Sequence, residues 1–477
     1  MSSSVTVSRP LAELSPAQSA VLAAWSAPTL LLGGPGTGKT TVLVHGMLSR
    51  LRTDAPAPIF LANSRLEASR LRNLLVRELG EGTWQPRVST VHALARSLWQ
   101  RFSGRADVRL LAAPEQEFRV RELLTGPTSV GWPATLAQAV GTRGFAAQVR
   151  AALARTRQLG LEPEDLVGFG DAAGRPEWAA LGLFFAEYLD VLDAEGVLDY
   201  AELVHRVRLL LADPEIQAVV WAETGAVLVD DFAELDPAQL ALAAAVAGTA
   251  PVLAAADPDS VSAAFRGADP RAIADFRRLL TRPDAETRVV RLEHGYRCGG
   301  AIAAALSGVR ARLPRPPGGG SPSLSTAPSA TGSPSTVPGP DGDVTVLGCA
   351  DEAQQARVIA DELRRARFDL GLDYSRMAVL VRSGRRQLDP ITRALLAAGV
   401  PVEVAGEDIP LAQAPAVRPL LLALEAAAAG EVSPDQAERL LTGPLGGFDS
   451  ISLRALCRQW WAAGNQAHRY LPVPAQL

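Results

Sequence analysis

One stretch indicates the architecture of this chain most strongly: Gly33-Gly34-Pro35-Gly36-Thr37-Gly38-Lys39-Thr40. It matches the phosphate-binding loop pattern G-x-x-x-x-G-K-[ST], whose glycines let backbone N–H groups close around phosphates. Of the 47 basic residues, Lys39 is the single lysine and all the others are arginine. A compact ammonium on a flexible stem reaches β- and γ-phosphates in a way that a planar guanidinium cannot imitate. We therefore expect a nucleotide-phosphate site, rather than a glycine-rich turn that binds nothing.

The segments around the loop agree with this interpretation. Residues 29–32 form an apolar run typical of a buried strand, and residues 41–44 open a helix whose N-terminus would face the phosphates. Thr40 would place its hydroxyl on Mg²⁺. The residues expected to bind the nucleotide in this segment are Gly33, Gly34, Pro35, Gly36, Thr37, Gly38, Lys39, Thr40 and Thr41.

Two adjacent acids, Asp230 and Asp231, follow the apolar run at residues 227–229. A carboxylate at the carboxyl end of a parallel strand, beside a phosphate loop, is where a Mg²⁺ ligand belongs. Two acids after an apolar run can also be an ordinary exit from a strand. Because Lys39 lies upstream, we expect Asp230 to hold Mg²⁺ together with Thr40.

Length and composition limit the class of protein. A chain of 477 residues that is 48% hydrophobic suggests two to four domains with large cores. No run of about 18 apolar residues and no secretory signal pattern is present, so we expect a cytoplasmic protein without a membrane partner. Cys298, Cys349 and Cys457 are too far apart in sequence to indicate a metal cluster or a disulfide framework. A net charge of −4 leaves a nucleic-acid partner open, since binding needs only a local basic face.

Strand-like runs alternate with helical stretches in the first part of the chain, which predicts a parallel α/β sheet. Residues 105–205 are rich in Ala, Leu and Arg and predict an inserted helical subdomain. Residues 314–340 contain mainly Pro, Gly, Ser, Thr and Ala, which is typical of a flexible, disordered linker. After it, apolar runs at 344–347, 377–381 and 400–404 predict strands that start a second α/β domain, with a helix near 352–365.

The order of several motifs resembles that of UvrD/Rep-type superfamily 1 DNA helicases. The similar segments are Leu14-Ser15-Pro16-Ala17-Gln18, the phosphate loop, Ser89-Thr90-Val91-His92-Ala93-Leu94-Ala95, Asp199-Tyr200-Ala201-Glu202-Leu203, residues 229–239, 256–268 and 378–383, and Leu292-Glu293-His294-Gly295-Tyr296-Arg297. The resemblance covers nearly the whole chain. It implies ATP hydrolysis coupled to 3′-to-5′ movement on single-stranded DNA, with a role in DNA double-strand break processing and repair.

The resemblance also implies a domain plan. A P-loop NTPase (RecA-like) domain 1A would comprise residues 1–104 and 206–313, and the helical insertion at 105–205 would be domain 1B. A partial second RecA-like domain 2A would cover residues 341–412, and a partial helical domain 2B residues 413–477. DNA, single- or double-stranded, would be the partner, and ATP and Mg²⁺ the cofactors.

Roles at the nucleotide site follow from the resemblance as well. Gln18 would bind adenine, Tyr296 would stack on the base, and Arg297 would reach the γ-phosphate. The residues expected to act in catalysis are Lys39, Asp231 and Arg297, with Asp231 orienting water. Tyr296 could instead belong to the core.

The residues expected along the DNA are Thr90, His92 and Arg266. Each has an ordinary alternative. A histidine in an apolar stretch is often a satisfied structural residue, and Arg266 could simply pair with Asp269.

Several positions depart from the family. Asp231 replaces a catalytic glutamate, which shortens the reach of the base by roughly 1 Å. Ser260 replaces the glutamine that senses the γ-phosphate, Ala263 replaces an aromatic residue that stacks on DNA, and Ala233 replaces another glutamine. The family's later motifs are missing before Leu477, including one whose arginine completes the nucleotide site. We therefore expect the N-terminal half of a longer protein, or a truncated reading frame.

Within the family, the arginine- and alanine-rich sequence most resembles the AdnA subunit of actinobacterial AdnAB helicase–nucleases. That resemblance implies a second, AdnB-like subunit as partner. Two other functions remain open: a nucleotide-binding but weakly hydrolysing scaffold subunit, which the substitutions favour, and a small-molecule phosphotransferase, which the ordered motifs disfavour.

Overall fold

The computed structural model describes residues 11–313, 342–404 and 417–448, together with 452, 453 and 455. Short gaps interrupt these ranges at 24, 54–55, 81–84, 105–107, 127–129, 270, 281–285 and 444. The chain divides into two units, Met1–Val344 and Thr345–Leu477, which are described separately. The predicted linker at 314–340 lies outside the described residues.

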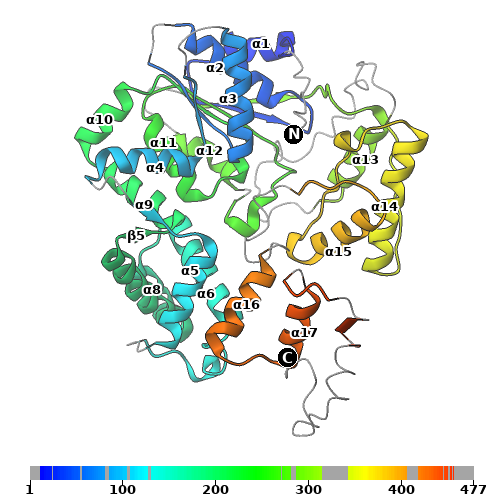
Figure 1. Cartoon of the computed structure of the whole chain (residues 1–477). Helices are drawn as coiled ribbons and strands as arrows, with labels where there is room; N and C mark the ends of the chain where they lie inside the picture. The colour runs from blue at the N-terminus through cyan, green and yellow to red at the C-terminus, as the bar shows by residue number, and fades with distance from the viewer. Residues whose placement is uncertain are drawn as a thin grey trace, which may run out of the picture. The chain divides into compact units, whose positions relative to one another are not determined.

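The first unit contains a six-stranded sheet in which every strand pairs in parallel (Figure 1). The strand order is β3-β2-β6-β7-β1-β8. The strands are β1 (Thr29–Gly33), β2 (Ile59–Leu61), β3 (Arg87–Ser89), β6 (Val227–Val229), β7 (Val252–Ala256) and β8 (Arg288–Leu292). The predicted parallel α/β sheet is confirmed, and its carboxyl ends meet along one edge.

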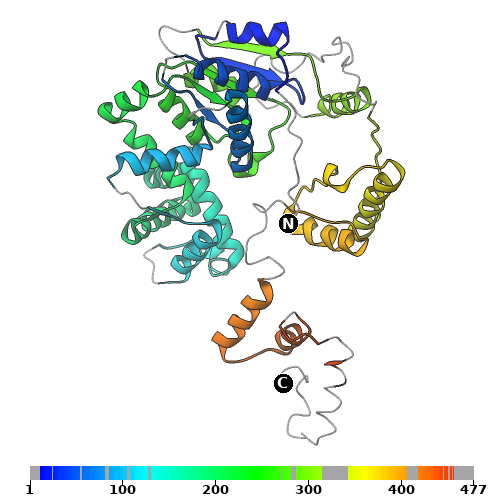
Figure 2. The ribbon, with the colours of Figure 1, turned by 45° about the horizontal axis from the view of Figure 1, so that its top comes forward.

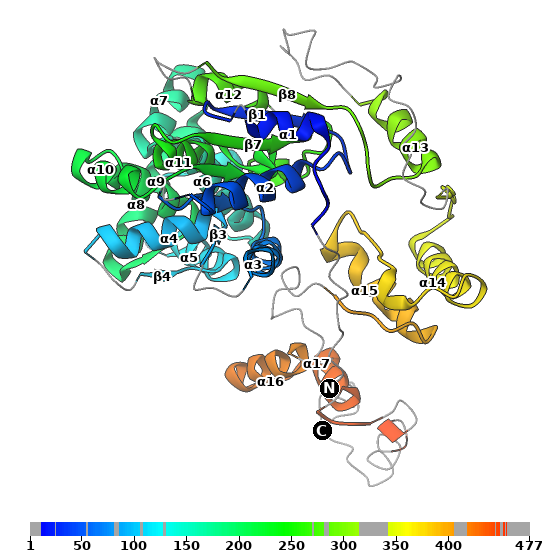
Figure 3. The same cartoon turned by 90° about the horizontal axis from the view of Figure 1, so that it is seen from above.

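Helices cover both faces of this sheet, as the view from above shows (Figure 3). The helices α1 (Pro16–Ala23), α2 (Lys39–Leu51) and α3 (Arg65–Leu79) pack on one face. The opposite face is covered by α4 (Val91–Phe102), α9 (Tyr200–Leu210), α10 (Pro214–Ala222), α11 (Pro237–Ala247) and α12 (Ala272–Leu280). Leu31 packs against the helices of the first face, and Leu30 and Leu32 pack against those of the opposite face, because side chains alternate along a strand. Because both faces are covered, the strands β2, β6 and β7 are apolar throughout and buried, whereas the outer strands β3 and β8 carry arginines.

The inserted residues form a helical subdomain with its own core. Its helices are α5 (Ala113–Thr125), α6 (Arg143–Gln158), α7 (Pro163–Ala173) and α8 (Pro176–Glu195), with a short 3₁₀ turn η1 (Ala134–Leu136). Phe184, Phe185 and Tyr188 fill the centre of this core. The short strands β4 (Arg109–Leu110) and β5 (Val197–Leu198) pair in parallel where the chain enters and leaves. The helix α9 that follows packs into the core of the sheet.

Three further short elements of the first unit carry residues of the site. They are η2 (Phe232–Glu234), η3 (Ala263–Arg266) and α13 (Gly300–Arg310). The turns η2 and η3 follow β6 and β7, and α13 follows β8, so each starts from the carboxyl edge of the sheet.

The second unit contains α14 (Glu352–Asp369), η4 (Tyr374–Arg376), α15 (Gly384–Ala397), α16 (Arg418–Ala429) and α17 (Pro434–Thr442), coloured yellow to red in Figure 2. The helix predicted near 352–365 is confirmed as α14. The three strands predicted at 344–347, 377–381 and 400–404 are wrong for the described residues, where none of these segments is a strand. An apolar run becomes a strand only when a neighbour pairs with its backbone, and Val346 and Leu380 are 92% and 91% exposed. In the described part of the chain, no helix has the length and apolarity needed to cross a membrane.

Candidate functional site

The glycine-rich loop connects the end of β1 to the start of α2. Gly36 and Gly38 adopt φ angles of +76° and +82°, which favour glycine. Gly38 is the N-cap of α2 and supplies no side chain to bond the first N–H groups of the helix. Pro35 is exposed beside them, Thr37 is buried, and Thr41 is the third residue of α2. The loop therefore presents backbone donors and a helix N-terminus to an anion.

Lys39 lies across the loop that precedes it. Its Nζ donates to the carbonyl oxygens of Gly33 at 2.9 Å and Gly34 at 3.0 Å. An ammonium has three protons, so two bonds to the loop leave a third for a phosphate oxygen. Burial lowers the pKa of Lys39, and the carboxylates of Asp257 and Asp230 oppose that shift.

Thr40 and Asp230, the two residues expected to hold Mg²⁺, lie within hydrogen-bonding distance of each other. Thr40 Oγ1 donates to Asp230 Oδ2 at 2.7 Å, and Asp230 N donates to Leu61 O at 3.0 Å, which fixes the end of β6. Burial raises the pKa of Asp230 from 3.8 to about 6. A hydroxyl and an electron-rich carboxylate suit Mg²⁺, and a cation there would supply the positive charge that this buried carboxylate lacks. The residues present thus fit the metal.

Asp231 is the single non-glycine residue with a positive φ among those that the structure describes, at 47°. Its backbone N–H donates to Asp230 Oδ1 at 3.0 Å. Burial, followed by repulsion from Asp230, raises the pKa of Asp231 to about 6. Left-handed backbone on a residue with a Cβ stores strain, and such strain occurs preferentially at functional sites. The strained position coincides with the residue expected to orient water.

The three remaining nucleotide-site residues surround the same loop. Gln18 on α1 is buried; its Nε2 donates to Thr37 O at 3.0 Å, and its Oε1 accepts from Ser15 N at 2.9 Å. In this arrangement the amide braces the loop. Tyr296 N donates to Gly36 O at 2.8 Å, while its half-exposed ring meets His294 edge-on.

Arg297 lies directly against the loop. A Cβ added to Gly36 would come within 2.7 Å of Arg297 Cβ. The structure therefore brings Gln18, Tyr296 and Arg297 together with the phosphate loop, from α1 and from the segment after β8.

The residues expected along the DNA are placed on two separate elements. Thr90 caps α4, since its Oγ1 accepts from Ala93 N at 3.2 Å. The His92 ring packs edge-on against Tyr200 with centroids 5.3 Å apart, and its Nε2 lies 3.4 Å from Gln239 Nε2. Burial, followed by repulsion from Arg65, lowers the pKa of His92 to about 4. His92 is therefore neutral at pH 7, and its structural alternative stays open.

Arg266 ends η3 and stacks over the exposed ring of Phe265, 5.1 Å from its centroid. The alternative in which Arg266 pairs with Asp269 is not what the structure shows. Asp269 instead binds Arg271, with 2.7 Å between Oδ2 and Nη2. The guanidinium of Arg266 thus remains on an accessible turn.

Glu234 is a site residue that sequence reasoning missed. Its carboxylate accepts from Ser262 N at 2.7 Å, Ser262 Oγ at 3.0 Å and Ala263 N at 2.6 Å. It therefore ties η2, which follows the Asp230–Asp231 pair, to the start of η3. The signal available in the sequence was an acid three residues after Asp231.

The other end of η3 is held by the helical subdomain. Arg155 Nη1 donates to Gly267 O at 2.7 Å, and Gln158 Nε2 donates to Arg266 O at 2.9 Å. These bonds join residues more than 100 positions apart, so no local pattern reveals them. The η3 turn is thereby fixed between the nucleotide site and α6.

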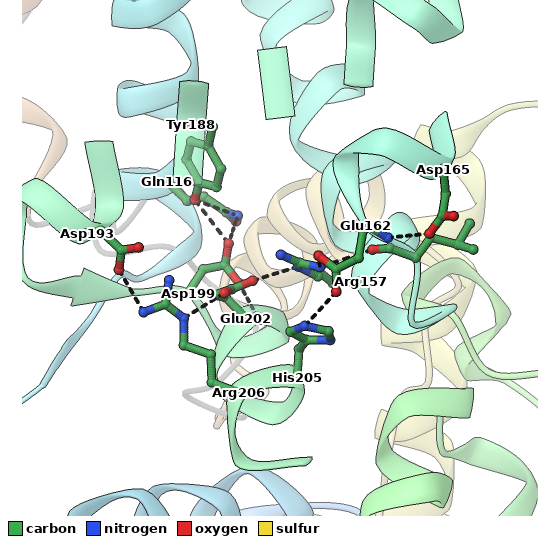
Figure 4. Close-up of polar contacts among 11 residues, drawn as sticks. Gln116, Arg157, Glu162, Asp165, Tyr188, Asp193, Asp199, Glu202, His205 and Arg206 are labelled. Carbon is green, nitrogen blue, oxygen red and sulfur yellow. Dashed lines mark hydrogen bonds and ion pairs between the residues drawn. The ribbon is translucent and has the colours of Figure 1, made fainter. Parts of the chain in front are cut away.

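A polar network anchors α6 to α9 (Figure 4). Arg157 Nε donates to Glu202 at 2.7 Å and Arg157 Nη1 to Glu162 at 2.6 Å, and His205 Nε2 lies 2.9 Å from Glu162. Asp199, the N-cap of α9, accepts from nearby side chains as well. The segment that begins at Asp199 is thus built into the junction between the helical subdomain and the sheet.

The parallel sheet, the phosphate loop and the paired acids together define a P-loop nucleotide-binding protein. The family described as "UvrD/REP helicase N-terminal domain" matches residues 14–281, so the chain belongs to the UvrD/REP helicases. It is 26% identical over 412 residues to DNA helicase II of Salmonella typhimurium and to that of Escherichia coli, which is 84% of this chain and 52% of either relative. It is 30% identical over 239 residues to ATP-dependent DNA helicase UvrD1 of Mycobacterium tuberculosis, which is 48% of this chain and 28% of that relative. The chain spans about half the length of the DNA helicase II relatives.

Proposed function

We propose that this chain is the ATP-binding motor region of a UvrD-type DNA helicase or translocase. It would couple ATP hydrolysis to 3′-to-5′ movement along single-stranded DNA. The observation that carries the proposal is the meeting of Thr40 and Asp230, 2.7 Å apart, at the carboxyl edge of the sheet beside Lys39. Because the chain belongs to the UvrD/REP helicases, we expect nucleotide binding to drive movement on DNA.

Each side chain has a role that follows from its position. Lys39 would offer its third proton to the β- and γ-phosphates, and backbone N–H groups of the loop would bind the remaining phosphate oxygens. Thr40 and Asp230 would hold Mg²⁺, which when bound neutralises phosphate charge. Asp231 would accept a hydrogen bond from the attacking water and orient it. Arg297 would stabilise the charge that develops on the transferred phosphoryl group.

The expected DNA contacts belong to the same proposal. Arg266, on the accessible η3 turn, would bind a phosphate of the strand, and Thr90 and His92 would lie along its path from the start of α4. Because His92 is neutral at pH 7, it would act as a hydrogen-bonding group rather than as a cation. Because Glu234 ties η3 to the segment that follows Asp230 and Asp231, the η3 turn would link the nucleotide site to the DNA contact of Arg266.

The finer assignment rests on sequence resemblance. It makes the chain an AdnA-like subunit that acts with a second, AdnB-like helicase–nuclease subunit in DNA double-strand break processing and repair. A weakly hydrolysing, nucleotide-binding scaffold is the second candidate. Asp231 favours it, because a carboxylate one methylene shorter than glutamate holds water less well, and misplacement of about 1 Å can cost about 10²-fold in rate.

DNA-stimulated ATP hydrolysis tests the proposal. The parent, Lys39→Ala and the exposed-surface control Arg121→Ala are assayed with and without single-stranded DNA. We expect DNA to stimulate the parent and the control equally and Lys39→Ala to be inactive. The scaffold would be favoured if the parent binds ATP, hydrolyses it far more slowly than about 10 s⁻¹, and shows no change in rate when DNA is added. A Lys39→Ala variant that both binds ATP and hydrolyses it as well as the parent does would refute both candidates.

A further inference from the structure

Arg310, the last residue of α13, reaches the edge of the sheet where the nucleotide site lies. Its Nε donates to Asp259 Oδ2 at 2.6 Å, and its Nη2 lies 2.5 Å from the same oxygen. Asp257 Oδ1 is 3.9 Å from Nη2. Asp257 directly follows β7 and Asp259 lies two residues further on, so α13 is attached to the carboxyl edge of the sheet by one guanidinium between two carboxylates.

The same guanidinium lies against the phosphate loop. A Cβ added to Gly34 would come within 2.5 Å of Arg310 Nη1. The carbonyl oxygen of Gly34 also accepts the 3.0 Å bond from Lys39 Nζ. Lys39 and Arg310, which are distant in sequence, thus both contact Gly34. Lys39 binds its carbonyl oxygen, and Arg310 lies beside its α-carbon.

The chemistry of the pair suits an exchange of anions. A guanidinium presents five N–H donors in a planar fork that fits a carboxylate or a phosphate equally well. Asp259 is 35% exposed and the Arg310 side chain 38% exposed, so separation of this pair costs little. Asp257 is buried and stays close to the guanidinium. A phosphate carries more charge than the single carboxylate that it would replace.

We propose that Arg310 is a phosphate-binding residue of the nucleotide site, which exchanges Asp259 for the terminal phosphate of a bound nucleoside triphosphate. The inference rests on the proposed nucleotide site and extends it. Arg310 then discriminates a triphosphate from a diphosphate, while Lys39 and the loop bind both. Asp259 competes with the phosphate and sets how tightly the triphosphate is held.

Equilibrium binding of a fluorescent, non-hydrolysable ATP analogue and of fluorescent ADP, both with Mg²⁺, tests the inference. The proteins are the parent, Arg310→Ala, Arg310→Lys, Asp259→Asn and the control Arg312→Ala, an exposed arginine two residues on. We expect Arg310→Ala to bind the triphosphate about tenfold or more weakly, as the loss of a charge-assisted hydrogen bond predicts, and to bind ADP as the parent does. Arg310→Lys keeps the charge but not the fork and should lie between.

Asp259→Asn gives the opposite and more specific result. It frees the guanidinium, so the triphosphate should bind several-fold more tightly with ADP binding unchanged. If Arg310 only ties α13 to the sheet, Asp259→Asn should bind the triphosphate as the parent does or more weakly. That result overturns the inference even if Arg310→Ala does not fold.

The outcomes separate the inference from the proposed function. A parent that binds both nucleotides and an Arg310→Ala variant that binds both equally well overturn the inference alone. Equal loss of both nucleotides in a folded Arg310→Ala variant also overturns it. A parent that binds neither nucleotide overturns the proposed nucleotide site and the inference with it.

Discussion

Thr40 Oγ1 donates a 2.7 Å hydrogen bond to Asp230 Oδ2, although 190 positions separate the two residues in the sequence. The strand order explains the contact. The strand β1 leads into the helix that begins at Lys39, β6 ends just before Asp230, and one strand, β7, lies between them. Parallel pairing brings both carboxyl ends to one edge, so a hydroxyl and a carboxylate meet where a metal-bound phosphate would lie.

Asp230 should make the folded chain less stable as the pH rises from about 4 to about 6. Its pKa is raised from 3.8 to about 6 by burial. The folded state therefore keeps a proton that the unfolded state has released, and the free energy of unfolding falls with rising pH by on the order of 2 kcal/mol. Urea unfolding across this range, in the parent and in Asp230→Asn, measures the effect.

The variant supplies the control for that experiment. The fall should be smaller in Asp230→Asn, and added Mg²⁺ should reduce it in the parent, because a bound cation favours the carboxylate. An identical fall in parent and variant would show that Asp230 does not carry the pH dependence.

Asp231 should be strained by its backbone, and replacement by glycine should relieve the strain. At φ 47°, a residue with a Cβ costs roughly 1–2 kcal/mol relative to glycine. We expect Asp231→Gly to unfold at higher denaturant concentration than Asp231→Ala, a difference that isolates the backbone because both variants lack the charge. Both should bind ATP and lose hydrolysis. Equal stability of the two variants would rule out the strain.

Restoring the longer side chain tests the role of Asp231 directly. Asp231→Glu should raise DNA-stimulated turnover if the reach of the base limits the rate, without a change in nucleotide affinity. Single-turnover hydrolysis measures the rate of the chemical step. A rate in Asp231→Glu at or below that of the parent would place the limit elsewhere.

Glu234 should couple the nucleotide site to η3. In Glu234→Ala, the N–H groups of Ser262 and Ala263 lose their carboxylate acceptor. We expect DNA stimulation of turnover to fall roughly tenfold, equivalent to about 1.4 kcal/mol, with nucleotide affinity retained. Glu164→Ala, which removes an exposed acid from α7, is the matched control. Loss of nucleotide binding in Glu234→Ala would instead show that Glu234 supports the loop itself.

Local patterns were sufficient to predict the phosphate loop and the acid that lies beside it at the end of β6. Gly33–Lys39 and Asp230 are recognisable because their chemistry requires particular residue types at short spacing. Glu234 and Arg310 were not predicted, since their contacts depend on pairing between distant segments. An arginine carries little signal in a chain whose basic residues are almost all arginine.

The second unit shows the limit of apolar patterning. Residues 344–347 and 377–381 have the composition of strands, yet neither is one in the described structure. A helix such as α14 makes its own backbone hydrogen bonds, so its sequence predicts it well. A strand depends on a neighbour, which a local pattern cannot supply.

Lys39 provides the most direct test of the proposed nucleotide site. Its Nζ already binds the loop at Gly33 and Gly34, which leaves a third proton for a phosphate oxygen. Titration of the parent and of Lys39→Ala with a fluorescent ATP analogue and Mg²⁺ measures the contribution of this single lysine. We expect the parent to bind the analogue and Lys39→Ala to bind it at least about tenfold more weakly, at unchanged thermal stability. Equal affinity in the two proteins would contradict the assignment of a nucleotide-binding motor.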